Sequence, residues 1–488
     1  MTISTVNPVL NPAFKRILKL NATRAFFGVF LRNVLALSLT LPLLAHSALA
    51  AAQTNPSNAA KQEQLPTQAE FAAWLTGFKV QARQAGISQD TLNLAFADVK
   101  LNPKILESDR KQPEFISTFW EYFERAVSSG RIENGQIQLK NHQALLNQVT
   151  QKYGVPQTVL LAFWGMETNY GRFTGSQPII ESLATLAFDP RRSGFFTNEL
   201  LNALLILNRG DVALSQMKGS WAGAMGHVQF MPSNYVKYAV DGDGDGKINL
   251  WDSLPDALHS AGNFLQHLGW LQNQHWGTEV TLPQNFNYAQ ADGKTTRSLA
   301  QWHALDLKSV NGQTLSGQPN AQNIQARLVL PSDYRGPAFL VYDNFKIIKR
   351  WNNADKYALA VGHLADRIAG QPALSKTKPA DDVRLSLDDM RQIQTLLNQQ
   401  GYPAGEPDGI AGTKTRNALR AFQVANNLPA DGYPSAHALV LLKQTQSTKT
   451  NATLANPQEP QTAPLNDNQP SETHTPFNNP LDSFSHSY

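Results

Sequence analysis

The chain has 488 residues, which is enough for two or three domains with sizeable cores. Its formal net charge is only +4, from 42 Lys and Arg against 38 Asp and Glu, and no long basic run occurs, so nucleic acid is not expected as a partner. The absence of cysteine excludes a disulfide framework and a lipidated cysteine at a cleavage site.

The first fifty residues have the pattern of a secretory signal peptide. Basic residues precede the apolar run VLALSLTLPLLA, and Ala48-Leu49-Ala50 supplies small residues for cleavage. The alternative is a retained membrane anchor, but the apolar run after Arg32 is short for a span and contains Pro42. We expect residues 1–50 to be removed, residues 51–67 to form a polar linker, and the mature protein to lie in the periplasm without a stable membrane anchor.

The next part of the chain is mainly helical. Apolar residues recur at helical spacing in its first segment, at Phe71, Trp74, Leu75 and Phe78. Between residues 278 and 342, short β-rich pieces such as EVTLP and ARLVLP alternate with Gly, Asn and Pro, before helical spacing returns at 356–368. The sequence predicts a mainly α fold of the α+β class, with a helical domain over residues 68–370 and a small β insertion.

A second polar break, QPALSKTKPADDVR, marks a linker over residues 371–385. Residues 386–443 then form a compact unit for which we predict three short helices. The last stretch, 444–488, is rich in Thr, Asn, Pro and Gln and has few clustered apolar residues. We predict that this tail is disordered.

One glutamate lies in apolar company, in the stretch FWGMETNYG. A carboxyl group held away from water, such as that of Glu167, has a raised pKa and can donate a proton near neutral pH. The stretch GSWAGAMGHVQFMPSNY, residues 219–235, combines glycines that let the backbone approach a ligand with side chains suited to sugar hydroxyls. Taken singly, a helix-surface glutamate and a structural turn cluster explain these stretches equally well.

Together the two stretches resemble the lytic murein transglycosylases of the B family, enzymes with a lysozyme-like core that cleave peptidoglycan strands. Further blocks fit that family in order: ESLATLAFD, INLWDSLPDALHSAGNFL, HLGW and RWNNADKYALAVGHLADRI. The resemblance covers about residues 68–370, and several blocks in register are far more specific than a single glutamate. It implies a lysozyme-like helical catalytic core.

The resemblance implies that Glu167 protonates the glycosidic oxygen between N-acetylmuramic acid and N-acetylglucosamine. Glu167 then accepts a proton from the muramic C6 hydroxyl, which closes on C1 and gives a 1,6-anhydro sugar. Because the substrate supplies the nucleophile, one carboxylate suffices where ordinary glycosidases use two. The implied substrate contacts are Ser220, Gln229, Asn352 and Tyr357. The chain departs from the family at Trp351, where a tyrosine is expected.

Four aromatic residues are candidates for stacking on sugar rings: Tyr122, Tyr170, Trp221 and Trp270. Of these, we include Tyr122 among the substrate-binding residues. Large aromatic side chains are mostly buried on average, so core packing is the more frequent fate for each of the four.

Two other functions remain open at this stage. A lysozyme-type hydrolase would use water in place of the C6 hydroxyl and would need a second carboxylate, for which Glu181 and Asp189 are the nearest in the sequence. A non-catalytic scaffold would keep the fold and bind the wall only, but it need not keep Glu167, Ser220 and Gln229 together.

The stretch DGDGDGKINLWD, residues 241–252, resembles an EF-hand calcium loop. The expected ligands are Asp241, Asp243, Asp245, the Lys247 carbonyl and Asp256, with Asp252 as the alternative last ligand. The family pattern favours Asp256 over Asp252. The glutamate mechanism needs no cofactor, so calcium would brace the fold, and a metal-free Asp-Gly turn is the alternative.

The C-terminal unit contains the pattern PDGIAGTKTRNALRAFQ, and its apolar residues Ile393, Leu396, Leu397, Leu419 and Phe422 form two helical faces. It resembles the three-helix peptidoglycan-binding domain of cell-wall enzymes, although a helical bundle for protein contacts would share this pattern. The implied partners are peptidoglycan glycan strands and, beyond them, cell-wall synthesis or hydrolysis complexes.

Overall fold

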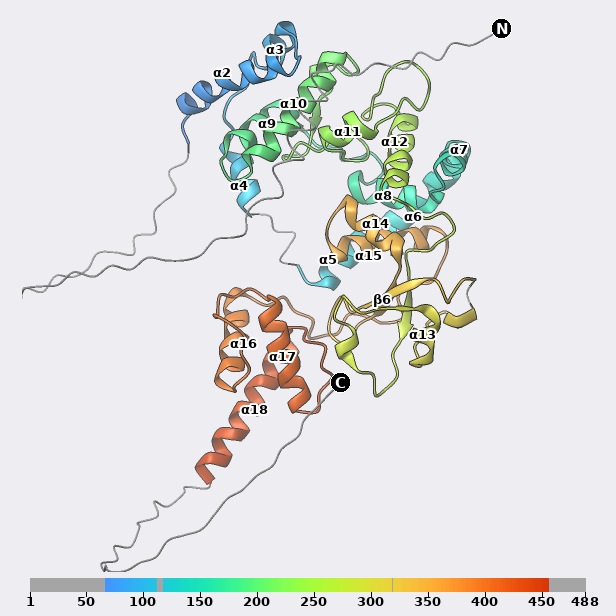
Figure 1. The fold of residues 1–488 in the computed structure, drawn as a ribbon, viewed down its shortest axis with the longest axis vertical. Coiled ribbons are helices and arrows are strands. Elements are labelled where there is room, and N and C mark those ends of the chain that lie inside the picture. Colours follow the sequence, from blue (N-terminus) through green and yellow to red (C-terminus); the bar gives the residue numbers. More distant parts are fainter. Residues whose placement is uncertain (1–65, 112–116, 318, 456–488) are drawn as a thin grey trace, which may run out of the picture.

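The computed structural model describes residues 66–111, 117–317 and 319–455 (Figure 1). A large helical region with a small sheet is followed by a separate group of three helices, so the predicted fold class is confirmed. The predicted signal peptide, and nearly all of the linker after it, lie outside the described residues.

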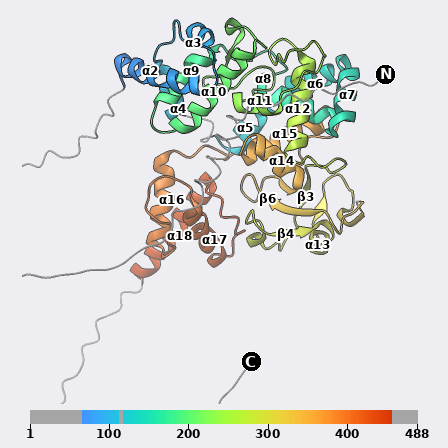
Figure 2. The same cartoon turned by 45° about the horizontal axis from the view of Figure 1, so that its top comes forward.

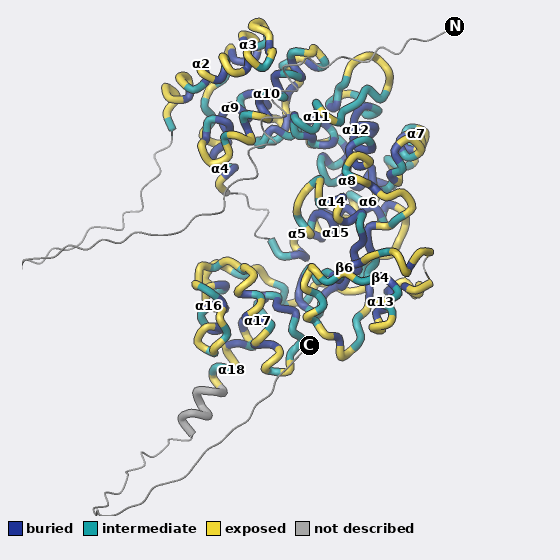
Figure 3. The backbone as a smooth tube through the Cα atoms, in the orientation of Figure 1, coloured by how far each residue is buried: buried dark blue, intermediate teal, exposed yellow. Residues whose placement is uncertain are grey.

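Two helices form the centre of the large region. In α8 (Gln157–Thr168) every residue from Val159 to Gly165 is buried, and in α15 (Asp355–Ile368) every residue from Tyr357 to Ala365 is buried (Figure 3). A helix that is apolar on all sides belongs inside a core, which explains this placement. The C-terminal end of α8 meets the N-terminal end of α15, so the two helices run antiparallel.

Five further helices pack around this pair: α5 (Phe119–Ala126), α6 (Ser129–Asn141), α7 (Gln143–Tyr153), α12 (Leu254–His267) and α14 (Asp343–Trp351). Five helices lie at the far side of the region (Figure 2): α2 (Gln68–Gln84), α3 (Gln89–Ala95), α4 (Pro103–Lys111), α9 (Ile179–Phe188) and α10 (Ser193–Arg209). The short α11 (Pro232–Tyr238) packs on α12 and α10. Phe71 of α2 meets Phe188 of α9 edge to face, with ring centres 5.5 Å apart. The helical spacing predicted for the first segment is therefore confirmed, with Phe71, Leu75 and Phe78 buried.

The β insertion is a five-stranded antiparallel sheet with the order β4-β6-β7-β3-β5. Its elements are β3 (Gly277–Thr281), β4 (Thr296–Ser298), α13 (Leu299–Ala304), β5 (Lys308–Ser309), β6 (Gln325–Val329) and β7 (Ala338–Val341). The sheet has its own small core, in which the side chain of Trp302 is fully buried and its indole N–H donates to the Ala326 carbonyl. Short turns of 3₁₀ helix occur at Leu214–Gln216, Tyr288–Gln290 and Leu315–Gly317.

The C-terminal unit consists of α16 (Leu387–Gln399), α17 (Thr413–Ala425) and α18 (Ala436–Ala455). Its core contains the five apolar residues that the sequence singled out, together with Leu439 and Leu442 of α18. The predicted start of the disordered tail is wrong, because α18 continues past Lys443 to Ala455. The polar residues after Lys443 include no Gly or Pro before Pro457, so nothing in the chain breaks the helix earlier.

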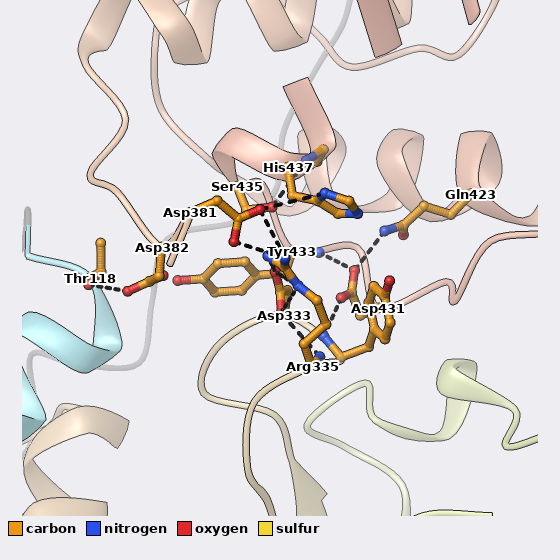
Figure 4. Close-up of polar contacts among 12 residues, drawn as sticks. Thr118, Asp333, Arg335, Asp381, Asp382, Gln423, Asp431, Tyr433, Ser435 and His437 are labelled. Atoms are coloured by element: carbon orange, nitrogen blue, oxygen red, sulfur yellow. Dashed lines mark hydrogen bonds and ion pairs between the residues drawn. The ribbon is translucent and has the colours of Figure 1, made fainter. Parts of the chain in front are cut away.

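The linker between the two units is held by side-chain contacts (Figure 4). Arg335, in the turn before β7, donates to Asp333 at 3.1 Å and to Asp381 of the linker at 2.8 Å. Next to it, Thr118 donates to the carboxylate of Asp382 at 3.0 Å. The linker therefore contacts both the sheet region and α5.

The C-terminal unit also contacts the sheet region directly (Figure 4). The carboxylate of Asp431 accepts a hydrogen bond from the Tyr334 backbone N–H at 2.7 Å and another from the Gln423 side chain at 2.7 Å. Asp431 is only 8% exposed, and burial raises its pKa. A buried carboxylate with these partners fixes the orientation of the C-terminal unit against the turn before β7.

Candidate active site

The two sequence stretches with the candidate chemistry meet at the C-terminal end of α8. The buried hydroxyl of Thr168 donates to the His227 carbonyl at 2.8 Å and accepts from the Gly171 N–H at 3.0 Å. The indole N–H of Trp164 donates to His227 Nδ1 at 2.9 Å, so this nitrogen carries no proton. Burial lowers the pKa of His227, which keeps the ring neutral and fixes its tautomer.

The backbone at this junction is unusual. Asn169, Tyr170 and Gln229 all have positive φ, at 49°, 61° and 49°, although none of them is glycine. Such conformations cost of the order of 1–3 kcal/mol each and concentrate at functional sites. Gly219 is also required by close packing, because a Cβ atom there would lie 2.1 Å from the Ala224 carbonyl oxygen.

Glu167 lies in the last turn of α8 and faces α15. The Tyr357 hydroxyl donates a short hydrogen bond to Glu167 Oε1. Burial raises the pKa of Glu167 to about 7, while hydrogen bonds from Tyr357 and Trp351 act in the opposite direction. The pKa of Tyr357 lies well above its ordinary value because of burial and the neighbouring carboxylate, so the phenol remains a donor. This carboxyl group can therefore both release and accept a proton near neutral pH.

Trp351 is the residue whose place in this site the sequence left open. Its ring lies 4.4 Å from the ring of Phe163, between centres, and also contacts Phe230 and Phe264. The departure from the family pattern at this position was the only signal in the sequence. A tryptophan here both excludes water from Glu167 and offers an N–H to it.

Ser220 and Gln229 lie in the loop that packs against the end of α8. The Ser220 hydroxyl oxygen accepts from the Ala224 N–H at 3.0 Å, which leaves its own proton for another partner. The Gln229 side-chain N–H₂ donates to the carbonyls of Thr174 and Gly226, each at 3.0 Å. Its amide oxygen has no partner among the described residues, so it stays available to a ligand.

The remaining predicted contacts lie on the α5, α14 and α15 side. Asn352 caps the end of α14 and is exposed. Tyr122 of α5 is partly exposed, and its charged form would raise the pKa of Tyr357, which places the two phenols close together. Of the other stacking candidates, Tyr170 and Trp270 are buried at 8% exposure, and Tyr170 donates to the Arg131 carbonyl. Tyr170 and Trp270 therefore pack in the core and are not available to stack on sugar rings.

The two carboxylates considered as partners for a hydrolase are both engaged elsewhere. Glu181 accepts from the Asn102 side chain at 2.9 Å, and Asp189 forms an ion pair with Arg110 at 3.2 Å. Among the described residues, no carboxylate charge contributes to the raised pKa of Glu167. A second carboxylate within the 5–10 Å that glycosidases use would be expected to do so.

The acidic loop gathers three carboxylates and leaves two aside. Oxygen atoms of Asp241, Asp243 and Asp256 lie within 4.8 Å of one another. Asp245 and Asp252 are outside this group. The Asp245 carboxylate accepts from the Lys247 N–H, and the Asp252 carboxylate accepts from Gln216 and Asn249. The predicted ligand Asp245 and the alternative Asp252 are therefore not brought to the cluster.

The cluster has the donors that a hard cation prefers. Asp256 is 1% exposed, and its two oxygens accept only backbone N–H groups, from Gly242 and Asn249, each at 2.7 Å. Three carboxylates that converge with no basic partner repel one another unless a cation lies between them. The donor set therefore fits calcium, whose ligands are carboxylate and carbonyl oxygens.

A helical core built around the pair Glu167 and Tyr357 is joined to a separate three-helix unit, an arrangement found in enzymes that cleave cell-wall glycans. Residues 70–366 match the family described as transglycosylase SLT domain, and residues 386–440 match a putative peptidoglycan-binding domain. The chain belongs to this transglycosylase family and is a lytic transglycosylase that acts on peptidoglycan.

Relatives of known identity support this assignment. The chain is 35% identical to membrane-bound lytic murein transglycosylase B of Escherichia coli over 267 residues, covering 53% of this chain and 70% of the relative. It is 44% identical to the solved structure of SltB3 from Pseudomonas aeruginosa in complex with NAG-anhNAM-pentapeptide, with a TM-score of 0.71, covering 76% of this chain and 99% of that one. A structure of the Escherichia coli enzyme Slt35 in complex with calcium is 31% identical, with a TM-score of 0.52, covering 61% and 92%.

Within residues 66–111, 117–317 and 319–455, no helix combines the length and the apolar character that a membrane span requires.

Proposed function

We propose that this protein breaks the β-1,4 bond between N-acetylmuramic acid and N-acetylglucosamine and leaves 1,6-anhydro ends, with Glu167 as the only catalytic carboxyl group. The observation that carries this proposal is the short hydrogen bond from the Tyr357 hydroxyl to Glu167, at a carboxyl group whose pKa burial raises to about 7 with no contribution from another carboxylate of the described chain. The anhydro sugar in the SltB3 complex supports the nature of the product.

In the first step, protonated Glu167 donates its proton to the glycosidic oxygen while the bond from that oxygen to C1 breaks. Positive charge develops at C1, and Glu167 becomes a carboxylate that the Tyr357 hydroxyl stabilises. In the second step, this carboxylate removes the proton of the C6 hydroxyl, whose oxygen bonds to C1 of the same sugar. No water is consumed, and Glu167 returns to its protonated form.

Four side chains are proposed to contact the substrate. The Ser220 hydroxyl and the amide oxygen of Gln229 both have unused hydrogen-bonding capacity in the loop that packs against the end of α8. Asn352 is exposed directly after Trp351, and Tyr122 is partly exposed near Tyr357. We assign these four side chains to binding and orienting the sugars next to the broken bond, which makes attack by the C6 hydroxyl an intramolecular reaction.

Mass spectrometry of the sugars released from purified peptidoglycan by the wild type and by Glu167→Gln tests the proposal. Anhydromuramic ends that disappear in the variant are the expected result. Reducing muramic ends would instead identify a hydrolase. Wall binding without release of sugars by either protein would identify a scaffold.

The C-terminal domain is proposed to hold the enzyme on the wall, as its family match suggests. Export to the periplasm through a cleaved signal peptide, and association with cell-wall synthesis or hydrolysis complexes, stay predictions from the sequence. They concern residues and partners outside the described structure.

We also propose a structural calcium ion held by Asp241, Asp243 and Asp256. The calcium complex of Slt35 supports it, and the ion would lower the repulsion of these carboxylates without taking part in the reaction. Calcium should raise the unfolding temperature of the wild type and of Asp252→Asn, but not that of Asp256→Asn. An equal increase in all three proteins would exclude this site.

A further inference from the structure

Basic residues line one exposed face of α14. Lys346, Lys349 and Arg350 are spaced three and four residues apart, so they share one side of the helix, while Phe345 and Ile348 are buried on the other. Like charges at this spacing repel one another and reduce helix stability by a few tenths of a kcal/mol per pair. Lys349 and Arg350 also lie in the last turn of α14, where cations are favourable toward the helix dipole, so the helix can keep this concentration of positive charge.

Two further cations complete the group from the β insertion. Lys294, before β4, and Arg327, on β6, line the same hollow of about 540 Å³ as the basic face of α14. The complete lining consists of Gly293, Lys294, Arg327, Lys346, Lys349, Arg350 and Asn353. No acidic side chain lines the hollow, which we call the basic hollow.

Ion pairs neutralise only part of the positive charge of the basic hollow. Lys346 pairs with Asp343 at 2.7 Å and Lys349 with Asp355 at 2.6 Å. Among the ion pairs of the described residues, none includes Lys294, Arg327 or Arg350.

Arg327 provides a second and independent sign of a missing partner. Its Nε atom is buried and has no hydrogen-bond partner in the described chain, and its outer nitrogen donates to the Gly293 carbonyl at 2.8 Å. Buried donors normally have partners, so this guanidinium on the wall of the basic hollow keeps hydrogen-bonding capacity that the described chain does not use.

The basic hollow and the active site meet at the C-terminal end of α14, because Arg350 and Asn353 line the hollow and Trp351 lies between them in the chain. α14 ends at Trp351, which packs on Phe163 of α8 and hydrogen-bonds to Glu167. Asn352, one of the proposed sugar contacts, and Asn353, which lines the hollow, follow directly in the chain. A ligand that extends sideways from a sugar near Glu167 along α14 would therefore reach these cations.

Peptidoglycan has such an extension, because each muramic acid carries a short peptide that contains carboxylates. We infer that the basic hollow binds the carboxylates of the stem peptide on the strand being cleaved. Charge complementarity and the meeting with the site at the end of α14 favour this occupant over a separate anion, and Arg327 and Arg350 suit the fork geometry of a carboxylate. The inference rests on the proposed function, since it assigns the peptide of that same substrate.

The test compares two substrates: peptidoglycan with its stem peptides, and glycan strands from which an amidase has removed them. We use the double variant Lys294→Gln/Arg350→Gln, because both side chains are exposed and the fold should survive. Its kcat/KM on the peptide-bearing substrate should fall about tenfold or more, while that on stripped strands stays unchanged. Lys104→Gln/Lys376→Gln, which removes two exposed cations elsewhere, should change neither value.

The other possible outcomes also decide between the explanations. Equal losses on both substrates, or no loss on either, would overturn the inference. If Arg350→Gln affects folding, seen as a lower unfolding temperature, Lys294→Glu alone should still reduce kcat/KM on the peptide-bearing substrate only. Failure of the wild type to form anhydro ends on either substrate would overturn the proposed function itself.

Discussion

Replacing Tyr357 with Phe should move the pH dependence of cleavage to higher pH. The Tyr357 hydroxyl stabilises ionised Glu167, and with burial acting against it the pKa is about 7. A hydrogen bond to a charged group contributes about 1.5–3 kcal/mol. One pKa unit corresponds to about 1.4 kcal/mol, so loss of this bond should raise the pKa of Glu167 by about one to two units.

The first step of the reaction determines the direction in which kcat/KM changes with pH. Glu167 must be protonated to act as an acid, so kcat/KM of the wild type should decline as pH rises through about 7. In Tyr357→Phe this decline should occur about one to two pH units higher. The maximal rate should be lower as well, because the carboxylate formed between the two steps has lost a donor.

The assay is release of soluble anhydromuropeptides from purified peptidoglycan from about pH 5 to about pH 10, which runs from about two units below the wild-type pKa to about one unit above the highest value expected for the variant. Tyr170→Phe is the matched control, since its hydroxyl donates to the Arg131 carbonyl at 2.7 Å and not to Glu167. In Tyr170→Phe, kcat/KM should decline at nearly the same pH as in the wild type. A decline at unchanged or lower pH in Tyr357→Phe would refute the role given to this hydroxyl.

Three more predictions concern stability and domain coupling. Because Glu167 ionises at about pH 7 when folded but near its ordinary 4.5 when unfolded, the wild type should lose roughly 3 kcal/mol of stability between pH 4.5 and 8. Denaturant unfolding of Glu167→Gln should lack that loss, and an identical loss would contradict the raised pKa. Phe422→Ala leaves a cavity in the core of the C-terminal domain and should lower its free energy of unfolding by about 3–5 kcal/mol. Less of this variant should sediment with insoluble peptidoglycan, while its cleavage of short soluble strands should persist. Arg335→Gln leaves the buried carboxylate of Asp333 without its cation and frees Asp381, so trypsin should cut the linker faster than in the wild type, and equal rates would refute the contact.

Much of the fold was predictable because its signals are local. The β insertion occupies residues 277–341, close to the predicted 278–342, since alternating strands and turn residues are visible in short windows. The end of α18 was not predictable from composition, because a polar segment without Gly or Pro forms either a helix or a tail depending on what precedes it. Here a helix anchored by Leu439 and Leu442 extends into it.

The candidate site also has one part that is visible in the local sequence and one part that only tertiary packing brings together. The apolar surroundings of Glu167 can be seen in its own stretch, but Tyr357 is 190 residues away, and only the packing of α15 on α8 joins them. That pair came from the resemblance and not from any local pattern. In the acidic loop, spacing predicts Asp245 as a ligand, whereas the oxygens that converge in the structure belong to Asp241, Asp243 and Asp256, and this convergence depends on how the loop folds onto α12.

The contacts of Arg335 and Asp431 hold the C-terminal domain in one orientation, so the linker is not a free tether. A free tether would let the C-terminal domain sample many orientations, and every productive binding event would have to select one of them. Here the two domains are already oriented by folding, so the rotational entropy is lost before a strand arrives. These contacts fix the distance between the C-terminal domain and Glu167. If that domain binds a glycan strand, the strand is cut at a fixed distance from the place where it is bound.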